Sequence, residues 1–122
     1  MFKTIVMHEF SIALNILEIA ESTAVQHEAS GISEVEVEVG DAAGVNIEAL
    51  EFAWESAAGS SALLKHSKLI IHSVPLIFEC ARCHHHYNPA DIPESCPACG
   101  EYDSILIQGR ELRVKSVTLA DP

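Results

Sequence analysis

The chain has 122 residues and a formal net charge of −11, with 18 acidic and seven basic side chains. A chain of this length fits a single domain that buries about two-thirds of its unfolded surface. The share of hydrophobic residues, 48%, excludes the usual composition of disordered and fibrous proteins. The negative charge would repel phosphate backbones and anionic lipids, so neither nucleic acid nor a membrane is an expected partner.

No segment of the sequence reads as a membrane anchor or a secretory signal. The longest apolar stretch, residues 69–78, is interrupted by polar residues and proline and is too short for the roughly 30 Å hydrocarbon core of a bilayer. The first ten residues, MFKTIVMHEF, lack the apolar run of a signal peptide. These features predict a cytoplasmic protein.

The first predicted element is a helix from about Glu9 to His27. Glu9 would then lie in the first turn and His27 in the last, where the helix dipole favours an acid and a protonated imidazole. The apolar residues that share its predicted buried face are Phe10, Ala13, Leu14, Leu17, Ala20 and Ala24.

Residues 34–39 read EVEVEV, which is a strict alternation of glutamate and valine. Side chains alternate between the two faces of a strand, so this pattern predicts a half-buried strand. Its valines would pack against the core, and its glutamates would face solvent on the open side of an antiparallel sheet.

Asn46 is a good N-cap residue, and it precedes a second predicted helix that Gly59 would end. The expected buried stripe of this helix includes Trp54, which we therefore interpret as a core residue. The other members of the stripe are Ile47, Leu50, Ala57 and Ala58.

Two further strands are predicted, over Lys68–Val74 and Glu111–Leu119. In the second of these, Leu112 and Val114 are expected to point inward, with a slip in the alternation near Ser116. The fold class is therefore α+β, with a small sheet of about three strands and two helices.

An inserted module of different character is predicted over residues 79–104, between 1–78 and a returning C-terminal strand in 105–122. It holds all four cysteines and most of the prolines. Because it has too few apolar residues for a core of its own, it needs a metal or disulfides.

The cysteines follow the pattern Cys80-x2-Cys83-x12-Cys96-x2-Cys99. Each C-x2-C pair forms a turn called a zinc knuckle. Two knuckles suit a tetrahedral Zn²⁺ ion with four thiolate ligands and no open position, which indicates a structural role. Two disulfides, disfavoured in the cytoplasm, and a rubredoxin-type iron site are the alternatives. Gly100 can adopt the left-handed turn after the second knuckle, whereas His84 must adopt it at a cost or turn differently.

The remaining chemistry of the sequence is sparse. The run His84–His86 can bind transition metals, but we favour an exposed loop, and His66 and His72 are expected to be structural. The module has one basic residue, Arg82, and five acidic ones, so protein contact or support of the fold is expected rather than nucleic-acid binding. No nucleophile elbow or phosphate-binding glycine loop is present, and we expect no enzymatic activity.

Four segments, taken in order, give the chain a family resemblance: MHEFSIALNILEIAE (7–21), VEVEVGDAAGVNIEALEFAWE (35–55), CPACG (96–100) and GRELRVKSV (109–117). The chain resembles the HypA/HybF nickel metallochaperones of [NiFe]-hydrogenase maturation. This resemblance implies a nickel-binding α/β domain with an inserted zinc domain. It also implies a GTPase partner, HypB, and delivery of Ni²⁺ to the hydrogenase large subunit, with urease as a further recipient.

By this resemblance the motif Met7-His8-Glu9 is the nickel site. His8 would be the essential ligand, while Met7 and Glu9 would contribute chiefly main-chain nitrogen. A terminal amine, the His8 backbone nitrogen, its imidazole and the Glu9 nitrogen would form a square-planar set suited to Ni²⁺.

The chain departs from the family in two places. Six residues, MFKTIV, precede Met7, although the motif normally begins the protein. We expect translation to start at Met7, and the alternatives are that the extension is removed or that nickel binding is altered. His84 stands where the family usually has glycine. A zinc-ribbon interaction module without nickel delivery and a rubredoxin-like electron carrier are the competing functions.

Overall fold

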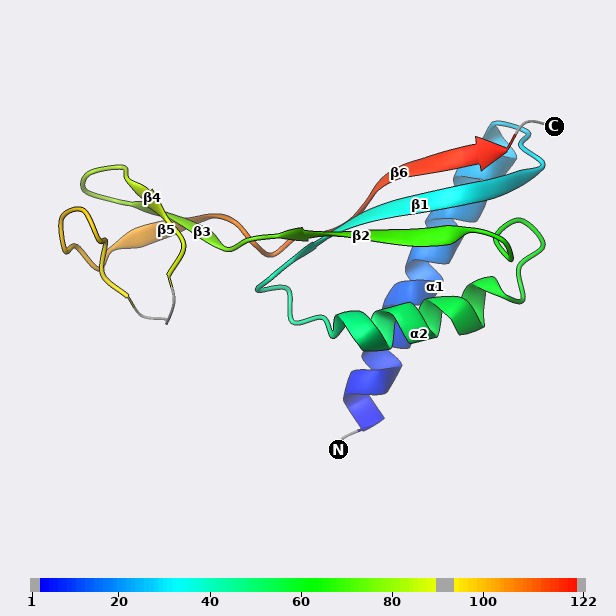
Figure 1. Cartoon of the computed structure of the whole chain (residues 1–122), viewed down its shortest axis with the longest axis horizontal. Coiled ribbons are helices and arrows are strands. Elements are labelled where there is room, and N and C mark those ends of the chain that lie inside the picture. The colour runs from blue at the N-terminus through cyan, green and yellow to red at the C-terminus, as the bar shows by residue number, and fades with distance from the viewer. Residues whose placement is uncertain (1–2, 90–93, 121–122) are drawn as a thin grey trace. The chain divides into compact units, whose positions relative to one another are not determined.

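A computed structural model describes residues 3–89 and 94–120 of the chain. The elements in chain order are α1 (Lys3–Gln26), β1 (Gly31–Gly40), α2 (Ile47–Ala58), β2 (Lys68–Val74), β3 (Ile77–Cys80), β4 (His86–Tyr87), β5 (Ser104–Gln108) and β6 (Leu112–Ala120) (Figure 1). They form two compact units. The first comprises residues up to Glu38, Val45–His72 and the chain from Arg113, and the second comprises Val39–Gly44 and Ser73–Leu112.

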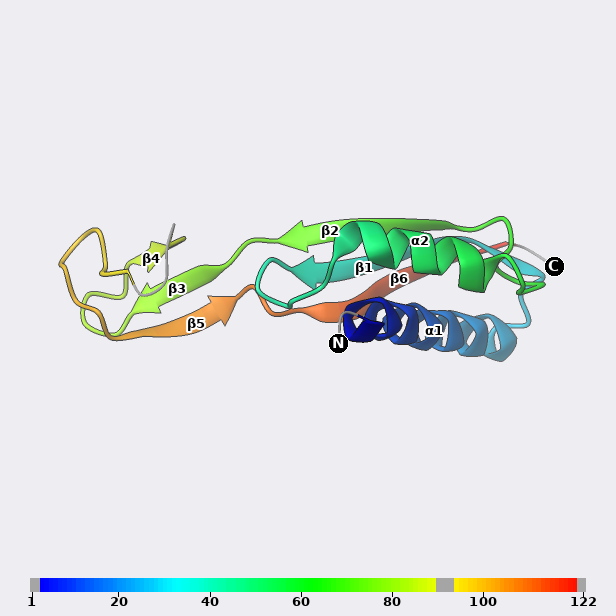
Figure 2. The same cartoon turned by 90° about the horizontal axis from the view of Figure 1, so that it is seen from below.

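The first unit is a three-stranded sheet of order β2-β1-β6, and both helices cover the same face of it (Figures 1 and 2). The helices pack side by side on this face. In the central strand, Val35 and Val37 are fully buried and the alternating glutamates are half-buried. This arrangement confirms the α+β fold and the predicted alternation of β1.

Helix α1 begins at Lys3, six residues before the predicted start at Glu9. The expected placement of charges at its ends is therefore wrong, because its first turn holds no acid and its last turn no basic residue. Residues 3–8 contain neither glycine nor proline, so nothing interrupts the helix there. The buried face is also rotated from the predicted one, since Leu14 is exposed. This face consists of Glu9, Ile12, Ala13, Ile16, Ala20 and Ala24.

Helix α2 forms as predicted. The side-chain oxygen of Asn46 accepts a hydrogen bond from the N–H of Ala49 at 3.0 Å, and the helix ends at Ala58 just before Gly59. Leu50 and Trp54 lie on the buried face of this helix, which confirms Trp54 as a core residue.

Strand β6 differs from the prediction at one position. Leu112 was expected to point inward but is 42% exposed. Arg113 pairs with Glu38 and Ser116 with Glu36, two glutamates on the same face of β1. The alternation of exposed and half-buried residues in β6 is interrupted at Ser116 and Val117, which are adjacent and both half-buried, so the predicted slip near Ser116 is confirmed.

The second unit contains a smaller sheet of order β4-β3-β5, in which β3 is antiparallel to both neighbours. Its core consists of Cys80, Tyr87 and Cys96, with Phe78 packed against them. The rings of Phe78 and Tyr87 meet edge to face, with centroids 6.1 Å apart. Half of this core is therefore cysteine, so whatever the cysteines bind also governs whether the unit is packed.

Two glycines make a close contact within the second unit. A Cβ atom on Gly40 would lie 2.1 Å from the carbonyl oxygen of Gly109, and Gly109 itself has a φ of 125°. The same oxygen accepts a hydrogen bond from the N–H of Ala42 at 2.7 Å. Only glycine fits at either position.

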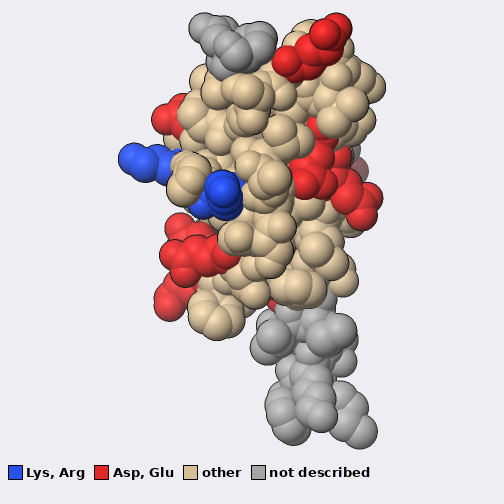
Figure 3. All heavy atoms as spheres, turned by 90° about the vertical axis from the view of Figure 1, so that its right-hand side faces the viewer, with Lys and Arg blue, Asp and Glu red and all other residues tan. Residues whose placement is uncertain are grey.

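Among the helices of the described residues, none has the length and apolarity needed to cross a bilayer. Acidic side chains are spread over the face drawn in Figure 3, while basic side chains gather at one side of it. This distribution agrees with the negative net charge of the sequence.

Candidate metal centres

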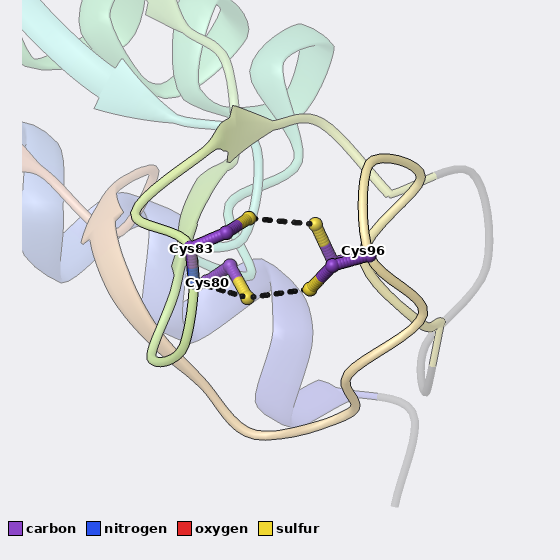
Figure 4. A group of neighbouring side chains, drawn as sticks. Cys80, Cys83 and Cys96 are labelled. Atoms are coloured by element: carbon purple, nitrogen blue, oxygen red, sulfur yellow. Dashed lines mark hydrogen bonds between the residues drawn. The ribbon is translucent and has the colours of Figure 1, made fainter.

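The four cysteines converge at one end of the second unit. Cys80 ends β3 and Cys83 lies in the following turn, while Cys96 and Cys99 belong to a second turn before β5. Figure 4 shows Cys80 and Cys83 facing Cys96 across a small space. The four Sγ atoms all lie within 4.8 Å of one another, and two of the cysteines, Cys80 and Cys96, are buried.

The distances between the sulfur atoms fit a metal better than disulfides. Cys80 and Cys99 have their Sγ atoms 3.5 Å apart, and Cys83 and Cys96 have theirs 3.7 Å apart. A disulfide requires about 2.05 Å. Four sulfurs, each about 2.3 Å from a tetrahedral zinc ion, would lie roughly 3.8 Å apart. The cysteines therefore have the spacing of a zinc–thiolate tetrahedron.

The two knuckles share one backbone pattern. The N–H of His84 donates to the carbonyl of Cys80 at 3.0 Å, and the N–H of Gly100 donates to that of Cys96 at 2.8 Å. Both donor residues have a left-handed backbone conformation, with φ of 66° at His84 and 81° at Gly100. His84 therefore adopts the left-handed turn at a cost, rather than turning differently.

Hydrogen bonds and neighbouring thiols give the cysteines unequal acidity. The N–H groups of Cys83 and Arg82, each 3.4 Å from the Cys80 sulfur, lower the pKa of Cys80 to about 7. The N–H of His85 lowers the pKa of Cys83, but desolvation and the adjacent thiols outweigh it and raise that pKa to about 12. Four thiolates at this spacing therefore require a bound cation.

Met7, His8 and Glu9 lie inside α1 rather than at a free chain end. In an α-helix each N–H donates to the carbonyl four residues earlier, so the main-chain nitrogens of these residues are already engaged. The side chain of His8 is exposed, whereas that of Glu9 is only 1% exposed. The side chain of Met7 lies outside the described part of the structure.

Glu9 has a role that the sequence reasoning missed. Its Oε2 accepts a hydrogen bond from the N–H of Asn46 at 2.8 Å, while its Oε1 is buried and without a partner among the described residues. The carboxylate thus ties α1 to the residue that caps α2. The signal was present in the sequence, since Glu9 falls at helix spacing from Ile12 and Ile16 on the buried face.

The histidines near the cysteines are divided between two sets of contacts. Glu79 accepts hydrogen bonds from His84 Nδ1 at 3.2 Å and from His86 Nε2 at 2.8 Å. These bonds, with that of His86 the larger effect, hold the pKa of Glu79 below its usual range. The ring of His85 instead stacks on that of Tyr87.

Comparison with known proteins gives a consistent result. The family model "Hydrogenase/urease nickel incorporation, metallochaperone, hypA" matches residues 7–119. The hydrogenase maturation factor HypA of Parabacteroides distasonis is 39% identical over 113 residues, which cover 93% of this chain and 97% of that protein. That of Geobacter sulfurreducens is 39% identical over 111 residues, covering 91% and 97%.

Two solved structures share the fold. The solution structure of the Ni metallochaperone HypA from Helicobacter pylori has a TM-score of 0.66 at 24% identity, covering 93% of this chain and 98% of that one. A second solution structure of a HypA protein has a TM-score of 0.73 at 26% identity, covering 95% and 98%. The family and its relatives are metallochaperones and maturation factors, not enzymes. This chain, matched over nearly its full length, belongs to the HypA family.

Proposed function

We propose that this chain is a nickel metallochaperone that binds Ni²⁺ at Met7, His8 and Glu9 and delivers it for the maturation of [NiFe]-hydrogenase. Cys80, Cys83, Cys96 and Cys99 hold a structural Zn²⁺ in the second unit. The observation that carries the nickel site is the exposed imidazole of His8 beside the buried Glu9, near the start of the family match at residue 7. The names of the family and of its relatives support the cargo and the destination.

Nickel binding by main-chain nitrogen requires those nitrogens to be released from the helix. The first four N–H groups of an α-helix have no acceptor within it. A chain that begins at Met7 would therefore free the main-chain nitrogens of His8 and Glu9 for the ion, and the nitrogen of Met7 would be a terminal amine. We propose that the form that binds Ni²⁺ begins there.

Glu9 would act in two ways in this site. Its main-chain nitrogen would complete the square of ligands around Ni²⁺, while its carboxylate would still accept the hydrogen bond from the N–H of Asn46. That hydrogen bond would hold the first turn of the helix against α2, so that the ring of His8 stays on the exposed side. A nickel site that is exposed in this way is suited to releasing its ion to another protein.

The proposed partners are a HypB-type GTPase and the hydrogenase large subunit. Urease maturation is a further candidate, since the description of the family includes it. Maturation of such enzymes would place the chain in the cytoplasm.

Calorimetric titration of Ni²⁺ into protein beginning at Met7 and into the 122-residue chain tests the nickel site. The shorter form should bind more tightly and show the absorption band of square-planar Ni²⁺. His8→Ala should remove that advantage. His27→Ala, which changes an exposed histidine just beyond the other end of α1, should leave it unchanged.

Three results would overturn this site. Equal affinity of the two lengths would show that the amine and the freed nitrogens are not ligands. Unchanged affinity in His8→Ala would place the site elsewhere. Failure of both lengths to bind Ni²⁺ would favour the zinc-ribbon interaction module without nickel delivery.

A further inference from the structure

Two exposed histidines and a half-buried glutamate form a compact group beside the cysteines but outside the thiolate set. Glu79 receives His84 on one carboxylate oxygen at 3.2 Å and His86 on the other at 2.8 Å. The side chains of the two histidines are 75% and 56% exposed, and that of Glu79 is 25% exposed. One carboxylate therefore orients two imidazoles that solvent can reach.

His84 is held in an unfavourable backbone conformation. It takes the left-handed turn that Gly100 takes in the matching knuckle, and the hydrogen bonds of the two knuckles are equivalent. Glycine would satisfy the thiolate site at this position without strain. A non-glycine residue kept in such a conformation points to a function for its side chain.

The neighbouring histidine provides an internal contrast. The ring of His85 lies parallel to that of Tyr87, with centroids 6.4 Å apart and planes inclined by 7°. Tyr87 belongs to the small core of the unit. His85 is thus engaged in packing, while His84 and His86 both turn to Glu79.

We propose that Glu79, His84 and His86 form a second metal site, for a divalent transition-metal ion such as Ni²⁺, distinct from the four cysteines and from His8. Two imidazole nitrogens and a carboxylate oxygen are ligands that such ions bind readily. The site goes beyond the proposed function and does not depend on it.

The distances within the group fit this role. Two donor atoms at a right angle about a metal, each about 2.1 Å from it, lie roughly 3 Å apart. The two nitrogen–oxygen distances, 3.2 and 2.8 Å, are of this size. Because His84 and His86 contact different oxygens of Glu79, the exposed histidine side chains would rotate to bring both nitrogens to one ion, which would take the place of the hydrogen-bonding protons. Water would fill the remaining positions, which makes the site open and labile.

The test uses the zinc-loaded 122-residue chain carrying His8→Ala, so that the proposed N-terminal site does not contribute. Calorimetric titration with Ni²⁺ should show one ion bound per chain. His84→Ala with His86→Ala should weaken that binding by more than about tenfold, and Glu79→Gln by about tenfold. His85→Ala is the matched control from the same run and should bind as the parent does.

His84→Gly separates a metal ligand from a structural residue. Glycine suits the left-handed turn, so this variant should keep its zinc, measured by elemental analysis, and still bind Ni²⁺ more weakly. Paramagnetic Ni²⁺ should broaden the NMR signals of His84 and His86 more than those of His85. Absence of Ni²⁺ binding in the His8→Ala chain, unchanged affinity in His84→Gly with His86→Ala, or equal loss in His85→Ala would overturn the proposal. None of these outcomes bears on the His8 site, which the comparison of chain lengths tests separately.

Discussion

Glu9 of α1 accepts a hydrogen bond from the backbone N–H of Asn46, with 2.8 Å between Oε2 and the nitrogen. Asn46 in turn accepts, through its side chain, the N–H of Ala49 in the first turn of α2. The carboxylate also lies at the positive end of the α2 dipole, which favours a negative charge. One buried glutamate thus fixes both the start of α2 and its contact with α1.

Replacing Glu9 by alanine should lower the free energy of unfolding by about 1–3 kcal/mol, because the part-buried hydrogen bond from the N–H of Asn46 loses its acceptor. Glu9→Gln keeps an acceptor and should cost less. Urea unfolding followed by the fluorescence of Trp54, the only tryptophan, measures both. Glu18→Ala, at an exposed position of the same helix, is the control, and an equal effect of the two alanine variants would contradict this role.

The second unit should depend on its metal. Structural zinc can contribute about 10–16 kcal/mol to folding, and the core here is small. Cys96→Ala should therefore lose zinc and unfold this unit, seen by NMR, while the helical circular dichroism and the fluorescence of Trp54 stay native. Ser95→Ala should keep its zinc. Elemental analysis that finds iron, or a folded unit without metal, would refute the assignment.

The matching knuckles predict opposite effects of two substitutions. His84→Gly should stabilise the second unit by about 1 kcal/mol, because glycine adopts the left-handed turn without steric cost. Gly100→Ala should destabilise it by a similar amount, since an added Cβ there meets no atom within 4 Å and only the backbone is strained. Competition for zinc with a chelator reports both, because metal binding and folding are coupled. Shifts in the same direction would show that the two turns are not equivalent.

The acid side of the stability profile should depend on Glu36. Its hydrogen bonds with His72, the larger effect, and with Ser116 hold its pKa below the usual value. A carboxyl whose pKa is lower in the folded state adds stability above its unfolded pKa of about 4.3, and this is lost as pH falls through the folded value. Stability measured by Trp54 fluorescence should therefore fall from about pH 5 downward.

Glu36→Gln should flatten this part of the profile. Glu34→Gln is the matched control, because Glu34 lies on the same face of β1 and its side chain makes no hydrogen bond or ion pair with the described residues. An identical acid profile in Glu36→Gln and in the parent chain would show that another group controls the loss.

Local signals in the sequence predicted much of the first unit. The alternation around Val37 is visible within six residues, and the cap at Asn46 acts on its own helix. The start of α1 was missed because no capping residue marks it. Contacts between different elements, such as the hydrogen bond between Glu9 and Asn46, depend on which faces of the elements pack together. That packing exists only once the chain has folded.

The sequence predicted that the four cysteines of the second unit form one metal site, but it did not predict the strands of this unit. Strands β3 and β5 pair Phe78 with Leu106 across the whole cysteine segment, and no local pattern encodes that register. The position of His84 was predicted as a problem of backbone conformation, while its contact with Glu79 was not. Spacing identifies which residues bind a metal, and pairing between distant strands decides what surrounds them.

The order of the larger sheet has a consequence for synthesis. Its central strand β1 pairs with β6, which the ribosome makes after all the other strands of the two sheets. Until then one edge of β1 is unpaired, and contacts this distant in sequence form slowly. All four cysteines have been made before β6, so metal capture can precede closure of the sheet. The metal site can therefore assemble while one edge of β1 is still exposed to aggregation.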